Sequence, residues 1–85
     1  MSWQLVVTAS AERQLKHFPK KVQIRMHTIL LEIAQNPFGG DVQKLQGAET
    51  TWRRRLGAFR FVYEVDISER RVFVYRIVRR SSNTY

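Results

Sequence analysis

The chain has 85 residues, which suffice for one small domain with a single core and exclude a repeat array or a multidomain enzyme. Hydrophobic residues make up 44% and charged residues 26%, a composition typical of a folded domain rather than a disordered chain. Fifteen Lys and Arg against seven Asp and Glu give a formal net charge of +8, which predicts a polyanionic or acidic partner.

The sequence contains no cysteine, which excludes disulfides, thiolate metal sites and thiol catalysis and fits a reducing cytosol. No apolar run approaches the roughly 20 residues that a membrane helix requires. The first residues, Met1 to Thr8, lack the basic start of a secretory signal. We therefore expect a soluble cytoplasmic protein with no membrane contact.

The first predicted elements are a strand over Trp3–Val7 and a short helix that ends at Pro19. Thr8 or Ser10 is suited to cap this helix by accepting a hydrogen bond from its first N–H groups. A second helix is predicted over Lys20–Gln35, because its apolar residues recur at spacings of three and four. Asn36-Pro37 and Gly39-Gly40 then end the helix. The segment from Asp41 to Thr51 has no sustained period, which predicts a loop.

The period changes to two in the second half of the chain, which predicts three strands over Trp52–Leu56, Phe59–Val65 and Val72–Val78. Their short connections, Gly57-Ala58 and Asp66–Arg71, allow no crossover helix. We therefore expect a single α+β domain over residues 1–85. It has an N-terminal strand, a two-helix hairpin and a three-stranded antiparallel meander. The first strand is added at one edge to give a four-stranded sheet, and the helices cover one face.

A two-residue turn at Gly57-Ala58 places Arg55 opposite Arg60, and alternation then assigns the side chains of both strands to the two faces of the sheet. The face toward the helices carries Trp52, Leu56, Phe59, Phe61 and Tyr63, with Arg54 as a charged misfit. The opposite face carries Arg53, Arg55, Arg60, Val62 and Glu64. In the last strand we assign the bulkier alternating residues Phe73, Tyr75 and Ile77 to the core, so that Arg76 and Arg80 join the arginine face.

Nine of the fifteen basic residues fall from Arg53 onward, and all nine are arginines. Like charges opposite each other destabilise a strand pair, so Arg55 beside Arg60 costs stability unless Glu64 or an external anion compensates. Guanidinium groups bind phosphate bidentately and remain charged, which favours RNA as the ligand. The alternative interpretation is a solvated face whose long side chains shield the sheet.

The order of these elements, together with several short motifs, resembles the RelE/ParE superfamily of type II toxin–antitoxin toxins. The motifs are Leu15–Pro19, Asn36-Pro37, Lys44–Gly47, Trp52–Arg55, Gly57–Glu64 and Arg76–Arg80. The resemblance covers nearly the whole chain. It implies an mRNA interferase of the RelE branch, a metal-independent and cofactor-free endoribonuclease that cuts messenger RNA in the ribosomal A site. Its implied partners are mRNA, the ribosome and a cognate acidic antitoxin.

The resemblance also implies which residues form the site. The catalytic candidates are Arg53, Arg55, Arg60, Arg80 and Tyr85, and the further RNA-binding candidates are Lys44, Arg76 and Arg79. In this scheme the RNA 2′-hydroxyl attacks the neighbouring phosphorus while Arg60 and Arg80 clamp the phosphate. Tyr85 stacks on a base or exchanges a proton, with a frayed chain end as the alternative. Arginines stand at Arg53 and Arg55 where well-studied members carry lysines, which leaves the general base open.

Other chemical groups carry weaker signals. His17 and His27 lie on predicted helices without paired ligand spacing, so we interpret them as surface residues and assign no metal. A carboxylate among arginines favours an ion pair for Glu64 over a general base. Two other functions remain open. One is a ParE-like inhibitor of DNA gyrase without nuclease activity, and the other is a non-catalytic RNA-binding module.

Overall fold

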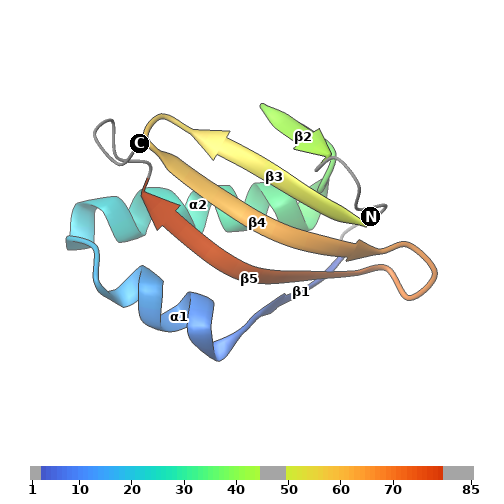
Figure 1. Ribbon diagram of the computed structural model, residues 1–85, viewed down its shortest axis with the longest axis horizontal. Helices are drawn as coiled ribbons and strands as arrows, with labels where there is room; N and C mark the ends of the chain where they lie inside the picture. The colour runs from blue at the N-terminus through green and yellow to red at the C-terminus, as the bar shows by residue number, and fades with distance from the viewer. Residues whose placement is uncertain (1–2, 45–49, 80–85) are drawn as a thin grey trace.

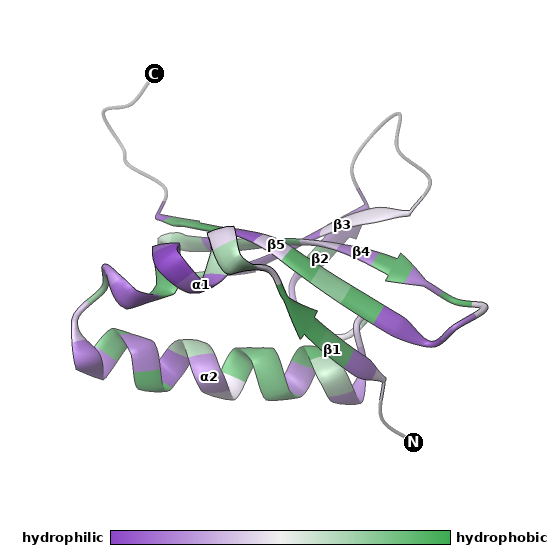
Figure 2. Cartoon of the chain, turned by 90° about the horizontal axis from the view of Figure 1, so that it is seen from below, coloured by the Kyte–Doolittle hydropathy of each residue, from purple (hydrophilic) through white to green (hydrophobic). Residues whose placement is uncertain are grey.

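The computed structural model describes residues 3–44 and 50–79 of the chain. In this part, five strands form one mixed sheet, and two helices lie on the same side of it (Figures 1 and 2). The elements in chain order are β1 (Gln4–Val7), α1 (Ala9–Lys16), α2 (Lys20–Gln35), β2 (Val42–Lys44), β3 (Thr51–Leu56), β4 (Phe59–Asp66) and β5 (Arg71–Arg79). The sheet therefore has one face covered by helices and one open face.

The helical hairpin follows the predicted capping and breaking residues. The Thr8 hydroxyl accepts a hydrogen bond from the Ala11 N–H at 3.2 Å and caps α1. Pro19 separates the two helices, and α2 covers Lys20–Gln35 as predicted. The Gln23 side chain donates to the Phe18 carbonyl at 2.8 Å and ties the connection to α2. Neither helix of the described part is long and apolar enough to cross a membrane.

The strand order is β1-β5-β4-β3-β2, with β1 parallel to β5 and the other neighbours antiparallel. The α+β class, the meander and the edge position of the first strand are confirmed. The predicted register is also confirmed, since Arg55 lies opposite Arg60. The prediction of four strands was wrong: part of the expected loop forms β2, which pairs with β3. A strand of three residues is too short to show a period in the sequence.

The predicted core face of β5 was wrong at two residues because the strand contains a bulge. Val62 pairs with Arg76 but Tyr63 pairs with Val74, so Tyr75 has no partner in this pairing. The extra residue reverses the alternation, and the buried residues are Val72 and Val74 before the bulge and Ile77 after it. Ile77 was assigned correctly. Phe73 instead pairs with Glu64 on the open face, and Tyr75 is 36% exposed.

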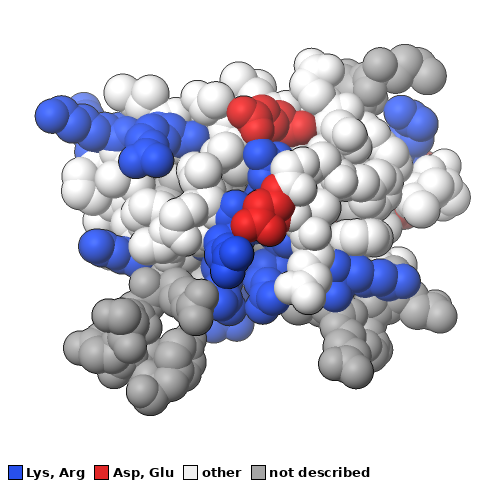
Figure 3. Space-filling model, turned by 90° about the horizontal axis from the view of Figure 1, so that it is seen from above, with Lys and Arg blue, Asp and Glu red and all other residues white. Residues whose placement is uncertain are grey.

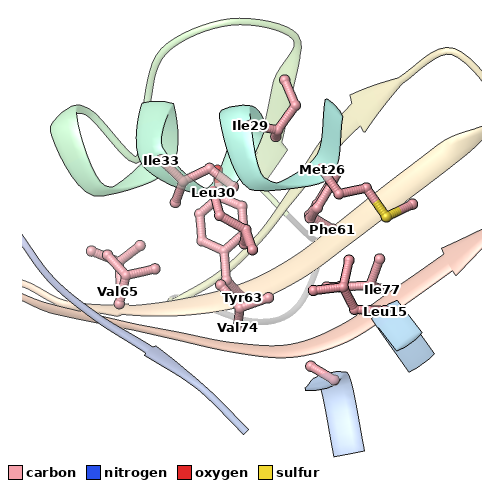
Figure 4. Close-up of a cluster of buried hydrophobic side chains, with 12 residues drawn as sticks. Leu15, Met26, Ile29, Leu30, Ile33, Phe61, Tyr63, Val65, Val74 and Ile77 are labelled. Carbon is pink, nitrogen blue, oxygen red and sulfur yellow. The ribbon is translucent and has the colours of Figure 1, made fainter. Parts of the chain in front are cut away.

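The core lies between α2 and the covered face of β4 and β5 (Figure 4). Met26, Leu30 and Ile33 point from α2 toward the strands. Phe61 and Tyr63 of β4 are fully buried beneath them. The covered face of the sheet is thus anchored, and the open face remains available to a ligand.

Tyr63 combines an apolar position with a buried hydroxyl. Its hydroxyl donates a hydrogen bond to the Pro37 carbonyl at 2.6 Å, which joins β4 to the segment after α2. Burial raises the pKa of Tyr63 to about 12, although the nearby positive charge of Arg54 opposes this shift. The buried hydroxyl therefore remains protonated at pH values where an unfolded tyrosine ionises.

Tyr63→Phe is expected to destabilise the fold by about 1 kcal/mol at neutral pH, because the Pro37 carbonyl loses its donor. Above pH 10 the unfolded state of the wild type gains stability by ionising Tyr63, and the folded state does so only near pH 12. The wild type should therefore lose stability between pH 10 and 12 more steeply than the variant. Urea unfolding of both proteins at pH 8, 10 and 11 measures this difference, and parallel pH profiles would contradict it.

Candidate anion-binding site

Three neighbouring strands bring arginines to the open face of the sheet. The register aligns Arg53 of β3, Val62 of β4 and Arg76 of β5 in one row across the strands. The next row holds Arg55 and Arg60. Residues in directly paired positions share a face, so these four arginines project to the same side. The structure therefore brings together the four predicted arginines of the open face that it describes.

A small pocket lies where β2 and the segment before it meet β3 and β4. It has a volume of about 70 Å³ and is lined by Asp41, Gln43, Arg53, Arg55 and Arg60. Seen from the side that carries β2, Lys and Arg side chains gather in a cluster with acidic groups beside it (Figure 3). Three guanidinium groups around one hollow have the charge and the donors that suit an anion such as a phosphate.

Two of the arginines in this pocket are held by the segment that the sequence predicted as a loop. Arg53 donates from Nη2 to Gln43 Oε1 at 2.7 Å. Arg55 donates from Nε to Asp41 Oδ2 at 3.1 Å, and its backbone N–H donates to the Asp41 carbonyl at 3.0 Å. Sequence reasoning missed Asp41 and Gln43 as site residues. No sequence signal marks them, because the three residues of β2 are too few to show a period.

Arg60 differs from its neighbours in having no such acceptor. Its Nε is buried and has no hydrogen-bond partner in the part of the chain that the structure describes. A buried polar group without a partner costs free energy that a ligand can recover by supplying an acceptor. Arg60 lines the same pocket as Arg53 and Arg55, and we regard it as the centre of the candidate site.

Arg54 points to the covered face, as its place in the alternation predicts, and is only 8% exposed. Its guanidinium pairs with Glu32 of α2. It also packs on Gly40, where a Cβ atom would lie 2.6 Å from Arg54 Cζ. Gly40 has a φ of +76°, which glycine adopts without strain. Arg54 thus braces the backbone directly before Asp41.

The other predicted site residues are distributed differently. Arg79 pairs with Phe59 and Lys44 with Trp52, so both project to the helix side of the sheet, away from the pocket. Arg79 lies with its guanidinium carbon 5.9 Å from the centre of the Phe59 ring. Arg80 and Tyr85 lie outside the described residues. The structure therefore does not bring Lys44 and Arg79 together with the open-face arginines.

Glu64 lies on the open face, as predicted, but the expected ion pair with an arginine is absent among the described residues. Its carboxylate instead accepts a hydrogen bond from the Thr50 hydroxyl at 3.1 Å. Acidic partners are found for Arg54, Arg55 and Arg71, namely Glu32, Asp41 and Glu69. His17, which follows α1 as its C-cap, and His27 of α2 are both exposed, away from the pocket.

Solved structures of toxins share this fold. The RelE chain of the archaeal RelE–RelB complex from Pyrococcus horikoshii superposes with a TM-score of 0.84 at 22% identity, covering 96% of this chain and 99% of that one. The isolated E. coli RelE toxin superposes with a TM-score of 0.83 at 20% identity, covering 98% of this chain and 89% of that one. A YoeB/ParE toxin from Agrobacterium tumefaciens superposes with a TM-score of 0.76 at 24% identity, covering 92% of this chain and 99% of that one. At these identities the likeness establishes the fold.

The family assignment comes from the sequence itself. No curated protein matches the chain in sequence. A family model described as the ParE toxin of the type II toxin–antitoxin system, parDE, matches residues 5–84. This match spans both helices, β1 from Leu5 onward, the other four strands and the four open-face arginines. The chain therefore belongs to the RelE/ParE superfamily of type II toxin–antitoxin toxins.

Proposed function

We propose that this toxin is an endoribonuclease that cuts messenger RNA on the ribosome and so inhibits translation in the cytoplasm. The observation that carries the proposal is the pocket in which Arg53, Arg55 and Arg60 converge. Three permanent positive charges at one point suit a phosphate whose negative charge rises during reaction. A bound RNA phosphate also supplies the acceptor that the buried Arg60 Nε lacks among the described residues.

In the proposed reaction, the oxygen of the RNA 2′-hydroxyl attacks the adjacent phosphorus in line. The bond from phosphorus to the 5′-oxygen breaks, which leaves a 2′,3′-cyclic phosphate and a 5′-hydroxyl end. The arginines stabilise the charge on the non-bridging oxygens, and Arg80 completes the clamp with Arg60. Arginines do not release protons at neutral pH, so we assign to Tyr85 the proton that the leaving 5′-oxygen gains, while the proton of the attacking 2′-hydroxyl passes to water.

We propose an acidic antitoxin as the partner that silences the protein. The net charge of +8 and the open arginine face favour a partner with complementary charge. The related archaeal RelE was solved in complex with RelB, a precedent for such a partner. Co-expression of the small protein encoded beside this toxin is expected to restore growth, and a lack of rescue would contradict the proposal.

A second candidate function is inhibition of DNA gyrase without nuclease activity. The observation that favours it is that the matching family model describes ParE toxins. In this case the arginine face binds a protein or DNA surface and performs no chemistry. A non-catalytic RNA binder would use the same face for salt-dependent affinity alone.

One induced culture distinguishes these candidates. The toxin is expressed in a bacterial host while the 5′ ends of messenger RNA are mapped and gyrase-linked DNA breaks are measured. The proposed function requires growth arrest with new 5′-hydroxyl ends inside coding sequences. Arrest with DNA breaks and intact messengers would instead identify the gyrase inhibitor. Arrest with neither change would indicate a binder that acts without cutting.

A further inference from the structure

A second and larger cavity lies on the open face, at the end of the sheet where β4 turns into β5. Its volume is about 420 Å³, within the range of small-molecule sites. It is lined by Thr50, Glu64, Val65, Asp66, Ile67 and Phe73. Carboxylates and apolar side chains line this cavity, whereas the first pocket is dominated by arginines. The two hollows on one face therefore suit chemically different parts of a ligand.

The cavity lies in line with the arginine pocket. Glu64 follows Arg60 by four residues on β4, and the alternation places both side chains on the open face. Four residues of a strand span about 13 Å, since each residue rises about 3.3 Å. Val62 and Arg76 lie in the row between the two hollows, and Arg53 of the same row lines the arginine pocket. A chain-like ligand with a phosphate at Arg60 can therefore extend over this row and reach the cavity.

The groups in the cavity are arranged to recognise an uncharged ring with hydrogen-bond donors. Phe73 lies directly opposite Glu64 in the register, so an aromatic ring stands beside a carboxylate. The Arg71 guanidinium carbon lies 5.7 Å from the centre of the Phe73 ring and orients it. The hydroxyl of Thr50 donates to Glu64 Oε1 at 3.1 Å. In the described part of the chain, Glu64 Oε2 remains without a partner.

Asp66 contributes less to recognition because its carboxylate is already engaged. Asp66 Oδ1 accepts hydrogen bonds from the Ser68 hydroxyl at 2.8 Å and from the Glu69 N–H at 3.2 Å. These bonds hold the turn between β4 and β5. Glu64 is therefore the acceptor that a ligand in the cavity meets.

We infer that this cavity holds one base of the bound RNA, with Phe73 packing against the base and Glu64 accepting from its amino group. Adenine, cytosine and guanine present such a donor on their Watson–Crick edge. Uracil presents two carbonyl oxygens beside a single N–H, and these repel a carboxylate. Glu64 and Asp66 also disfavour a phosphate in the cavity, and the cation beside it, Arg71, lies over the Phe73 ring and pairs with Glu69. The base and not the backbone therefore enters. The inference rests on the proposed RNA cleavage and assigns a sequence preference to it.

The test is Glu64→Gln, which keeps the shape of the side chain but adds an amide donor that a uracil carbonyl accepts. Messenger 5′ ends are mapped after expression of the full chain, and base frequencies are compared at each position around the cut. The wild type is expected to disfavour uridine at one fixed position by about tenfold. Glu64→Gln should lose this preference at that position. Phe73→Leu should weaken the preference at the same position.

The control is Glu12→Gln, which makes the same chemical change at an exposed residue of α1 on the other side of the sheet. Thermal unfolding of each variant checks that the fold is retained. An unchanged base preference in folded Glu64→Gln would overturn the inference and leave RNA cleavage standing. If this variant instead escaped the antitoxin with its preference unchanged, the cavity would hold a basic side chain of that partner, which also overturns the inference. A wild type that cuts no RNA would reject the proposed function and the base site with it.

Discussion

Arg60→Ala is expected to reduce RNA cleavage by roughly 10²- to 10³-fold, the loss seen when one donor to a developing negative charge is removed. Arg60 lies in the pocket between Arg53 and Arg55, and its Nε lacks an acceptor among the described residues. Removing its guanidinium therefore breaks no hydrogen bond or ion pair in the described part. The loss should appear in the rate of cutting, measured as the yield of 5′-hydroxyl ends at matched toxin levels.

Two further variants separate the specific role of Arg60 from the effect of total charge. Arg25→Ala removes the same charge from an exposed position on α2 and should leave cutting nearly unchanged. Arg60→Lys keeps the charge but loses the planar N–H donors that bind a phosphate bidentately. It should therefore cut only slightly more RNA than Arg60→Ala. Equal loss in Arg60→Ala and Arg25→Ala would show that only net charge matters. Full cutting by Arg60→Ala would remove this residue from the site.

The parts of the fold that sequence reasoning predicted well are those fixed by local signals. The bounds of α2 follow from Pro19 at one end and Asn36-Pro37 at the other, with a regular apolar stripe between them. The register of β3 and β4 follows from the two-residue turn at Gly57-Ala58, since a turn of known length fixes every pair beyond it. In such segments, residues close together in the sequence determine the structure.

The errors arose where distant contacts decide the structure. The alternation in β5 was read as unbroken, but the bulge at Tyr75 exchanges the faces between Val74 and Ile77. Its position depends on how β5 pairs with β4 and β1, which no short window of sequence contains. Phe73 was consequently assigned to the core, although it lines the larger cavity on the open face.

The candidate site was predicted only in part, because local alternation places some of its residues and strand pairing places the others. Alternation placed Arg53, Arg55 and Arg60 together because they lie on two strands joined by a tight turn. Their acceptors on and beside β2 were not predicted, because a strand of three residues shows no period that would pair it with β3. Arg76 and Arg79 are three residues apart on one strand, so simple alternation already separates them onto opposite faces. Attention to this spacing would have separated Arg79 from the arginine face.

Arg54 is the residue at which the sequence and the fold conflict most, because it places a charge on the covered face. Glu32→Ala is expected to destabilise the protein by about 2 kcal/mol, since it leaves the guanidinium of Arg54 buried without its acidic partner. The side chain of Glu32 is itself 52% exposed, and water can reach part of the pair, so the loss stays below that of a fully buried pair. Urea unfolding at pH 7 measures the change.

A double variant tests whether the loss comes from the stranded charge. Arg54→Met fills a similar space without a charge, so Glu32→Ala combined with Arg54→Met should be more stable than Glu32→Ala alone. Glu12→Ala removes an exposed carboxylate of α1 and should change stability by less than about 0.5 kcal/mol. Because Arg54 also packs on Gly40, directly before Asp41, Glu32→Ala should weaken the contact that holds Arg55 and thereby lower cutting. A stable Glu32→Ala variant with full cutting would show that Arg54 does not need Glu32, and that the small pocket does not depend on this ion pair.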